Sequence, residues 1–108
     1  MELKAIIQER GLDVVNRDIN NRALIELGLT RKLRTEIILG LSAADYCKGP
    51  EEDRDRPGEV WVFGAHVDEN EIYIKLKIAE IGLTKIAKCI SFHKAQAQLY
   101  YPLRIDPR

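Results

Sequence analysis

The chain has 108 residues, of which 45% are hydrophobic and 31% are charged, and its formal net charge is zero. These values predict one folded domain over residues 1–108 and argue against wholesale disorder. The balanced charge removes the simplest argument for nucleic-acid binding, a strongly basic domain, but leaves local basic patches open. No apolar run approaches the ~20 residues that cross a bilayer, and the N-terminus has no signal pattern. We therefore expect a cytoplasmic protein without a membrane partner.

The N-terminal segment predicts a short helix followed by a short strand. Residues Leu3–Arg10 carry apolar side chains at helical spacing, and Gly11 suits the end of that helix. Residues Leu12–Asn16 favour a strand because they include two neighbouring valines, which are β-branched.

Two further helices are expected before the middle of the chain. One covers Ile19–Leu27 with Asp18 as its N-cap, and the next runs from the N-cap Thr30 to Leu39. Basic residues crowd the first turn of the latter helix, where the helix dipole disfavours positive charge: Arg31, Lys32 and Arg34. They are interpreted either as a solvated basic face or as a patch for an anionic partner.

The segment between the helices and the strands is predicted to be irregular. Residues Ala43–Cys47 favour a short helical turn, which Gly49 and Pro50 would end. Residues Glu51–Gly58 form a charged stretch without an apolar side chain to anchor it. We expect a mobile loop there, and loops of this length often carry function.

The second half of the chain gives the clearest structural signal. Three strands are expected over Glu59–Val67, Glu71–Ala79 and Lys85–His93, and their short connections predict an antiparallel meander. The fold class is therefore α+β, with a small antiparallel sheet packed against the N-terminal helices. The tail, residues 95–108, would either lie along the sheet or be partly loose.

Side-chain alternation assigns two faces to this sheet. In the middle strand the aliphatic side chains would face the helices, whereas Tyr73, Lys75 and Lys77 would face the other way. In the last strand, alternation predicts that the core residues are Ile86, Ile90 and Phe92. The opposite, polar face of that strand would then carry Ala87, Cys89, Ser91 and His93.

The polar face suits phosphodiester chemistry. Metal-independent RNA cleavage uses the 2′-hydroxyl as nucleophile and needs a base, an acid and cations. His93 and Tyr73 can move protons, and Lys75 can stabilise the developing charge. The alternative is an ordinary solvated sheet face. Trp61 and Phe63 share one face of their strand and are interpreted as core residues, with base stacking as the alternative.

The cysteines and histidines suggest a weaker alternative, a structural zinc site. The four candidate ligands are Cys47, His66, Cys89 and His93. No pair of them has the close spacing typical of such sites, so we expect no metal. Cys89 and His93 would lie about 13 Å apart along a strand, which is too far for a nucleophile and its base. We expect both thiols to be reduced in the cytoplasm.

A resemblance to a known family covers residues 27–93. The sequence pieces that carry it are, in order, Leu27-Gly28-Leu29, a helix ending in Ile37-Ile38-Leu39-Gly40-Leu41-Ser42, Asp45-Tyr46, a strand containing Trp61, Ile72-Tyr73-Ile74-Lys75-Leu76, and Ile90-Ser91-Phe92. With this order and spacing the chain resembles the MqsR family of toxins. The resemblance implies a RelE-like fold, an mRNA-cleaving endoribonuclease without a cofactor, and a cognate antitoxin. DNA would be contacted only indirectly, through an antitoxin that represses the shared operon.

The resemblance also implies residues for the site. Tyr73 matches the tyrosine of the family's Val-Tyr-Leu-Lys strand, and Lys48 falls near the lysine that follows its Asp-Phe/Tyr-Tyr segment. A C-terminal lysine of the family falls near His93 or Lys94. The family's glutamine beside the strand tryptophan falls near Val62, which cannot do polar work.

Two hypotheses follow for the whole chain. The first is a toxin that cleaves mRNA as a metal-independent endoribonuclease, and the second is a non-catalytic RNA- or protein-binding module on the same fold. For the first, the residues assigned to catalysis are Tyr73, His93, Lys48 and Lys75. Those assigned to RNA binding are Lys77, Arg54, Arg56 and Lys94.

Overall fold

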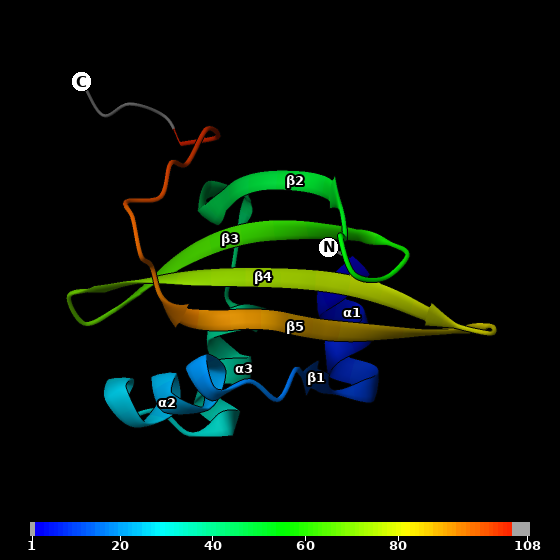
Figure 1. Cartoon of the computed structure of the whole chain (residues 1–108), viewed down its shortest axis with the longest axis horizontal. Helices are drawn as coiled ribbons and strands as arrows, with labels where there is room; N and C mark the ends of the chain where they lie inside the picture. The colour runs from blue at the N-terminus through cyan, green and yellow to red at the C-terminus, as the bar shows by residue number, and fades with distance from the viewer. Residues whose placement is uncertain (1, 105–108) are drawn as a thin grey trace.

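The computed structural model describes residues 2–104, which form three α-helices and a five-stranded mixed sheet (Figure 1). In chain order the elements are α1 (Glu2–Arg10), β1 (Leu12–Val14), α2 (Asp18–Leu27), α3 (Arg31–Leu39), the 3-10 turn η1 (Ala43–Asp45), β2 (Tyr46–Glu52), β3 (Glu59–Val67), β4 (Asn70–Ile81) and β5 (Thr84–Lys94). The strand order is β1-β5-β4-β3-β2, with β1 parallel to β5 and the other pairs antiparallel. The predicted α+β class and the β3-β4-β5 meander are confirmed.

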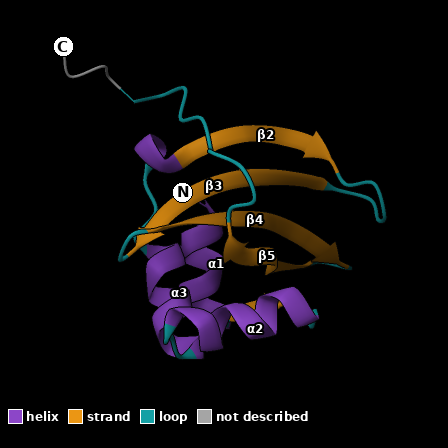
Figure 2. Ribbon diagram, turned by 60° about the vertical axis from the view of Figure 1, so that its left-hand side comes forward, coloured by secondary structure: helices purple, strands orange, loops and turns teal. Residues whose placement is uncertain are grey.

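The three helices all lie on one side of the sheet (Figure 2). They cover the aliphatic face of β4, where Ile72, Ile74 and Leu76 are fully buried, together with Phe92 of β5. Burial of these apolar side chains is the main driving force for the fold. The opposite side of the sheet has no helix among residues 2–104, so it is free to carry a site. No helix in this described range is long and apolar enough to span a membrane.

The helix ends follow the sequence signals with one exception. Thr30 caps α3 as predicted, because its hydroxyl accepts a hydrogen bond from the Leu33 N–H at 3.1 Å. Gly28 ends α2 in the left-handed conformation, with φ at 67°. The predicted cap Asp18 is wrong: it lies inside the first turn of α2, and Arg17 is the N-cap residue. Arg34 does not belong to a solvated basic face, because its side chain is buried against the core. This burial lowers the pKa of its guanidinium.

The predicted alternation of β5 is wrong for half of the strand. Lys75 pairs with Ser91, but the next pair is Leu76 with Cys89, so Ile90 is an extra residue in a β-bulge. Because of this extra residue, the side chains that precede the bulge point to the face opposite to the one that simple alternation predicts. The residues that reach the core are therefore Ala87, Cys89 and Phe92, whereas Ile86 and Ile90 lie on the helix-free face. Ser91 and His93 keep their predicted place on the helix-free face.

A buried asparagine of α2 holds this bulge. The Asn20 side chain is fully buried, and its amide nitrogen donates to the carbonyls of Val15 and Ile90, both at 3.0 Å. Its amide oxygen accepts from the Phe92 N–H at 3.1 Å. The backbone groups that flank the bulge thus find partners in one side chain, which removes the penalty for burying them unpaired.

The segment after the helices is more regular than predicted. Only Ala43–Asp45 is helical, and a further strand, β2, covers Tyr46–Glu52 and adds the outer edge of the sheet beside β3. The predicted loop Glu51–Gly58 therefore begins at Asp53, two residues later than expected. Its anchor is polar: the Asp53 carboxylate lies 2.6 Å from the Lys77 ammonium of β4.

The described part of the tail, residues 95–104, crosses the end of the sheet from β5 past β4 and β3 toward the start of β2 (Figure 1). Tyr101 packs on β3 at Gly64, where a Cβ would collide with the phenol ring and hydroxyl. The Arg104 guanidinium stacks 3.8 Å above the Tyr101 ring and lies 3.3 Å from the Asp45 carboxylate. Residues 105–108 lie outside the described range.

The hydrogen bonds that Asn20 makes to the β5 bulge give a prediction about stability. Asn20→Ala removes the side-chain partner of the Val15 carbonyl and the Phe92 N–H, and it leaves the Ile90 carbonyl with the weaker bond from Arg17. We therefore expect it to lower the free energy of unfolding by about 2–4 kcal/mol in urea denaturation. Asn21→Ala is the matched control: the Asn21 side chain donates to Asn16 at the surface of the described structure, and we expect a change within about 0.5 kcal/mol. Equal losses in the two variants would contradict the role given to Asn20.

Candidate functional site

The helix-free face of the sheet carries a tyrosine and a histidine in direct contact. Tyr73 of β4 pairs with His93 of β5 in the strand register, so both side chains leave the same face. Their rings are stacked, with centroids 5.4 Å apart and planes inclined by 23°. Two groups that can transfer protons therefore lie side by side on this face.

One ring nitrogen of His93 is already engaged. The His93 Nδ1 atom lies 3.0 Å from the Lys94 carbonyl oxygen. A carbonyl can only accept, so this contact requires a hydrogen on Nδ1. In the neutral ring the Nε2 atom is then the acceptor, which is the form a general base needs.

A cleft of about 770 Å³ opens on the helix-free face beside this pair. Its floor is formed by β4 and β5 with Tyr73, Lys75 and Ser91, and the loop segment 53–57 makes one wall. The basic side chains that line it are Arg17, Arg56, Lys75, Lys77 and Lys88. Three carboxylates, those of Asp53, Asp55 and Glu80, also line it, so the cleft has a formal excess of two positive charges in a chain that is neutral overall. This excess attracts anions.

Carboxylates hold two of these cations. The Lys77 ammonium, whose side chain is 5% exposed, is bound by Asp53, and the hydrogen bond from Lys77 holds the pKa of Asp53 below its usual range. Lys88 lies 3.7 Å from Asp13. Within the described range no carboxylate lies within 4.0 Å of the Lys75 ammonium or the Arg56 guanidinium.

Arg17 is a cleft residue that the sequence analysis missed. Its guanidinium donates to the Ser91 hydroxyl at 3.0 Å and to the Ile90 carbonyl at 3.3 Å. It precedes α2 and is far from β5 along the chain, so no local pattern could have found it. The contact with the bulge brings it to the cleft.

The remaining predicted residues, Lys48, Arg54 and Lys94, do not line the cleft. Lys48 shares the helix-free face in the row Lys48, Val62, Lys75, but it stands two strands from Lys75 and lies 3.6 Å from Glu51. Arg54 belongs to the loop and does not line the cleft. Lys94 pairs with the core residue Ile72, so the register directs it to the helix side of the sheet, away from His93.

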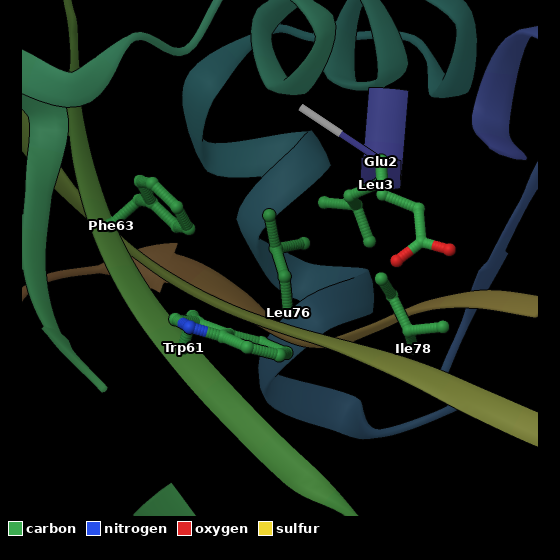
Figure 3. Close-up of a pocket in the computed structure, with 6 residues that line it drawn as sticks. All are labelled: Glu2, Leu3, Trp61, Phe63, Leu76 and Ile78. Carbon is green, nitrogen blue, oxygen red and sulfur yellow. The ribbon is translucent and has the colours of Figure 1, made fainter. Parts of the chain in front are cut away.

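An apolar hollow of about 250 Å³ lies on the helix side of β3, between Trp61 and the start of α1. Figure 3 shows Trp61 and Phe63 of β3 gathered around it with Leu76 and Leu3. Phe63 is buried in the core as predicted, whereas Trp61 is only partly buried and packs against the core's edge. Both rings lie on the face opposite to Tyr73, so neither stacks a base in the cleft.

The cysteines and histidines do not assemble. Cys89 is fully buried on the helix side, and burial raises its pKa to about 12, whereas His93 lies on the other face. Both thiols are free. Across residues 2–104 no three His, Cys, Asp or Glu side chains group as metal ligands.

Fold and cleft together define a small α+β protein with a cationic cleft on the helix-free face of its sheet. Residues 1–94 match the family described as "Motility quorum-sensing regulator, toxin of MqsA". The chain therefore belongs to the MqsR toxin family, which confirms the resemblance seen in its sequence. It is the toxin of a toxin–antitoxin system and has a cognate antitoxin as its partner. No curated protein and no solved structure matches it.

One carboxylate anchors the tail next to the cleft and gives a pH prediction. Burial alone would raise the pKa of Glu71, but donation from the Leu99 N–H at 2.9 Å and the Tyr101 hydroxyl at 2.8 Å outweighs it, and the pKa is lowered. A lowered carboxylate pKa stabilises the fold above the unfolded value near 4.5, and this contribution disappears as the pH falls through the folded value. The hydrogen-exchange protection factor of the Leu99 amide should therefore fall in that acidic range.

Glu71→Gln should remove this pH dependence, because the amide does not titrate. It should also lower the Leu99 protection factor at neutral pH about fivefold to tenfold, since charge-assisted hydrogen bonds are replaced by neutral ones. Glu69→Gln, an exposed neighbour in the β3–β4 turn, is the control and should behave as wild type. A Leu99 protection factor that keeps its pH dependence in Glu71→Gln would contradict this anchoring.

Proposed function

We propose that this toxin is an endoribonuclease that cleaves mRNA with its own side chains and without a metal ion. The observation that carries the proposal is the stacked Tyr73–His93 pair at the edge of a cationic cleft. The pair supplies groups for proton transfer, and the cleft supplies positive charge for a phosphate. Metal-independent RNA cleavage requires these components and no others, since the nucleophile belongs to the RNA.

The geometry supports a defined division of roles. His93 Nε2 takes the proton of the ribose 2′-hydroxyl, and the 2′-oxygen forms a bond to the adjacent phosphorus. The bond from phosphorus to the 5′-oxygen of the next nucleotide breaks, and Tyr73 gives that oxygen a proton. The products are a 2′,3′-cyclic phosphate and a free 5′-hydroxyl. Because the two rings are stacked, both can reach the two sides of one phosphate.

Cations beside the pair stabilise the charge of the phosphorane. Lys75 lies on β4 two residues beyond Tyr73 and on the same face. Arg17 is held against Ser91, which is the pairing partner of Lys75. Arg56 reaches the cleft from the loop wall and, with Lys48 on the outer strand, would contact the RNA backbone farther from the scissile bond.

The proton-transfer roles are tested by Tyr73→Phe and His93→Ala. We expect each variant to lose growth arrest on expression and to cleave RNA at least a hundredfold more slowly, because general acid–base catalysis contributes about 10²–10⁴-fold. Cleavage is measured on purified protein in the presence of a chelator. Tyr100→Phe is the matched control, since the Tyr100 side chain is 77% exposed, and it should retain full activity.

The outcomes separate the two hypotheses for this chain. If both variants cleave at the wild-type rate, the catalytic groups lie elsewhere. If wild-type protein binds RNA in chelator but never cleaves it, the binding-module alternative is correct. Circular dichroism on each variant shows whether a loss of activity arises from unfolding.

The ion pair in the cleft gives a second prediction. Asp53→Asn releases the Lys77 ammonium to contact RNA phosphate, so affinity for a 2′-O-methyl RNA should rise severalfold at low salt. One added phosphate contact should steepen the dependence of log K on log salt by about 0.7. Asp55→Asn is the control, because it makes the same charge change in the same wall without holding Lys77. Identical salt slopes in both variants would show that Lys77 stays out of contact with RNA.

A further inference from the structure

A second, smaller hollow shares a wall with the cationic cleft. It has a volume of about 230 Å³ and lies between the Tyr73–His93 pair and the tail. The residues that line it are Tyr73, His93, Gln96, Ala97, Gln98 and Leu99. Tyr73 also lines the cleft, so a molecule that occupies the cleft beside Tyr73 is adjacent to this hollow.

The chemistry of the two hollows is different. Arginines and lysines line the cleft, whereas among residues 2–104 no aspartate, glutamate, lysine or arginine lines the smaller hollow. The smaller hollow offers two carboxamides, two aromatic rings and the aliphatic Ala97 and Leu99. This set suits a flat, uncharged group with donors and acceptors on its edge, and a nucleobase has these properties. A phosphate would find the cations that it needs only in the cleft.

The tail segment that carries both glutamines is fixed at its two ends by one residue. The Ala95 N–H donates to the backbone carbonyl of Glu71 at 2.8 Å, and the Leu99 N–H donates to the Glu71 carboxylate at 2.9 Å. Residues 96–98 therefore form a short arch over the hollow. Such anchoring reduces the entropy that would be lost when a ligand orders the arch.

From these observations we infer that the smaller hollow binds the base of a nucleotide next to the scissile phosphate, and that the amides of Gln96 and Gln98 select that base. The inference rests on the proposed ribonuclease activity and adds its sequence preference. The volume of the smaller hollow is below the range of about 300–1,000 Å³ that is typical of pockets for drug-sized ligands. This size fits one base rather than several. The tail that carries both glutamines lies beyond the family match, which covers residues 1–94.

The test compares Gln96→Ala/Gln98→Ala with wild type in two assays. The first maps cleavage sites in a random-sequence RNA pool. The second measures affinity for a set of oligonucleotides that carry a 2′-deoxy sugar at the cleavage position, which blocks cleavage, and that differ in one base. We expect wild-type protein to prefer one base at one position, and the double variant to lose about tenfold or more of this preference in both assays.

Gln8→Ala is the matched control, because Gln8 is an exposed glutamine of α1 on the helix side of the sheet. It should keep the wild-type preference. A double variant that retains the wild-type preference overturns the inference while leaving the nuclease in place. Conversely, loss of binding preference in the double variant of a protein that never cleaves RNA would support the hollow and reject the nuclease. A wild-type protein with no base preference in either assay also overturns the inference.

Discussion

The hydrogen bonds of Asn20 to the β5 bulge decide which side chains reach the helix-free face. One buried carboxamide satisfies the Ile90 carbonyl and the Phe92 N–H, so β5 can carry an extra residue without leaving backbone groups unpaired in the core. The extra residue places Phe92 among the helices and His93 beside Tyr73. Arg17, at the start of the same helix, binds the same bulge and thereby enters the cleft. Core packing and site geometry therefore depend on the same contact.

The sequence alone predicts the parts of this arrangement that follow local rules. Strict alternation in β4 places Tyr73 and Lys75 opposite the aliphatic face, and the structure agrees. The same rule fails in the first half of β5, because a bulge is stabilised by a residue some 70 positions away and leaves no local mark. Ile86 and Ile90 look like core residues by composition, yet the smaller Ala87 and Cys89 occupy the core.

Polar anchoring explains the other differences between expectation and structure. The charged segment after β2 has no apolar side chain, and a search for apolar anchors overlooks the Asp53–Lys77 ion pair that holds it over the sheet. The tail is similar, since Glu71 fixes it through the Leu99 N–H and the Tyr101 hydroxyl. Burial raises the pKa of Tyr101 and the neighbouring carboxylate adds to this effect, so the phenol stays a hydrogen-bond donor. Pairing of this kind depends on tertiary proximity, which hydrophobic patterns do not encode.

The parallel pairing of β1 with β5 has a consequence for how the toxin is made. Residues 12–14 find their partners only at residues 87–89, and α1 and α2 also pack on β5. Contacts between such distant parts of a chain form late, because the intervening segments must be ordered first. During translation α1 and α2 therefore cannot make these contacts until β5 has left the ribosome. Tyr73 is synthesised well before His93 but has no stacking partner in the nascent chain. The Tyr73–His93 pair, on which the proposed activity rests, can therefore form only after β5 has been synthesised.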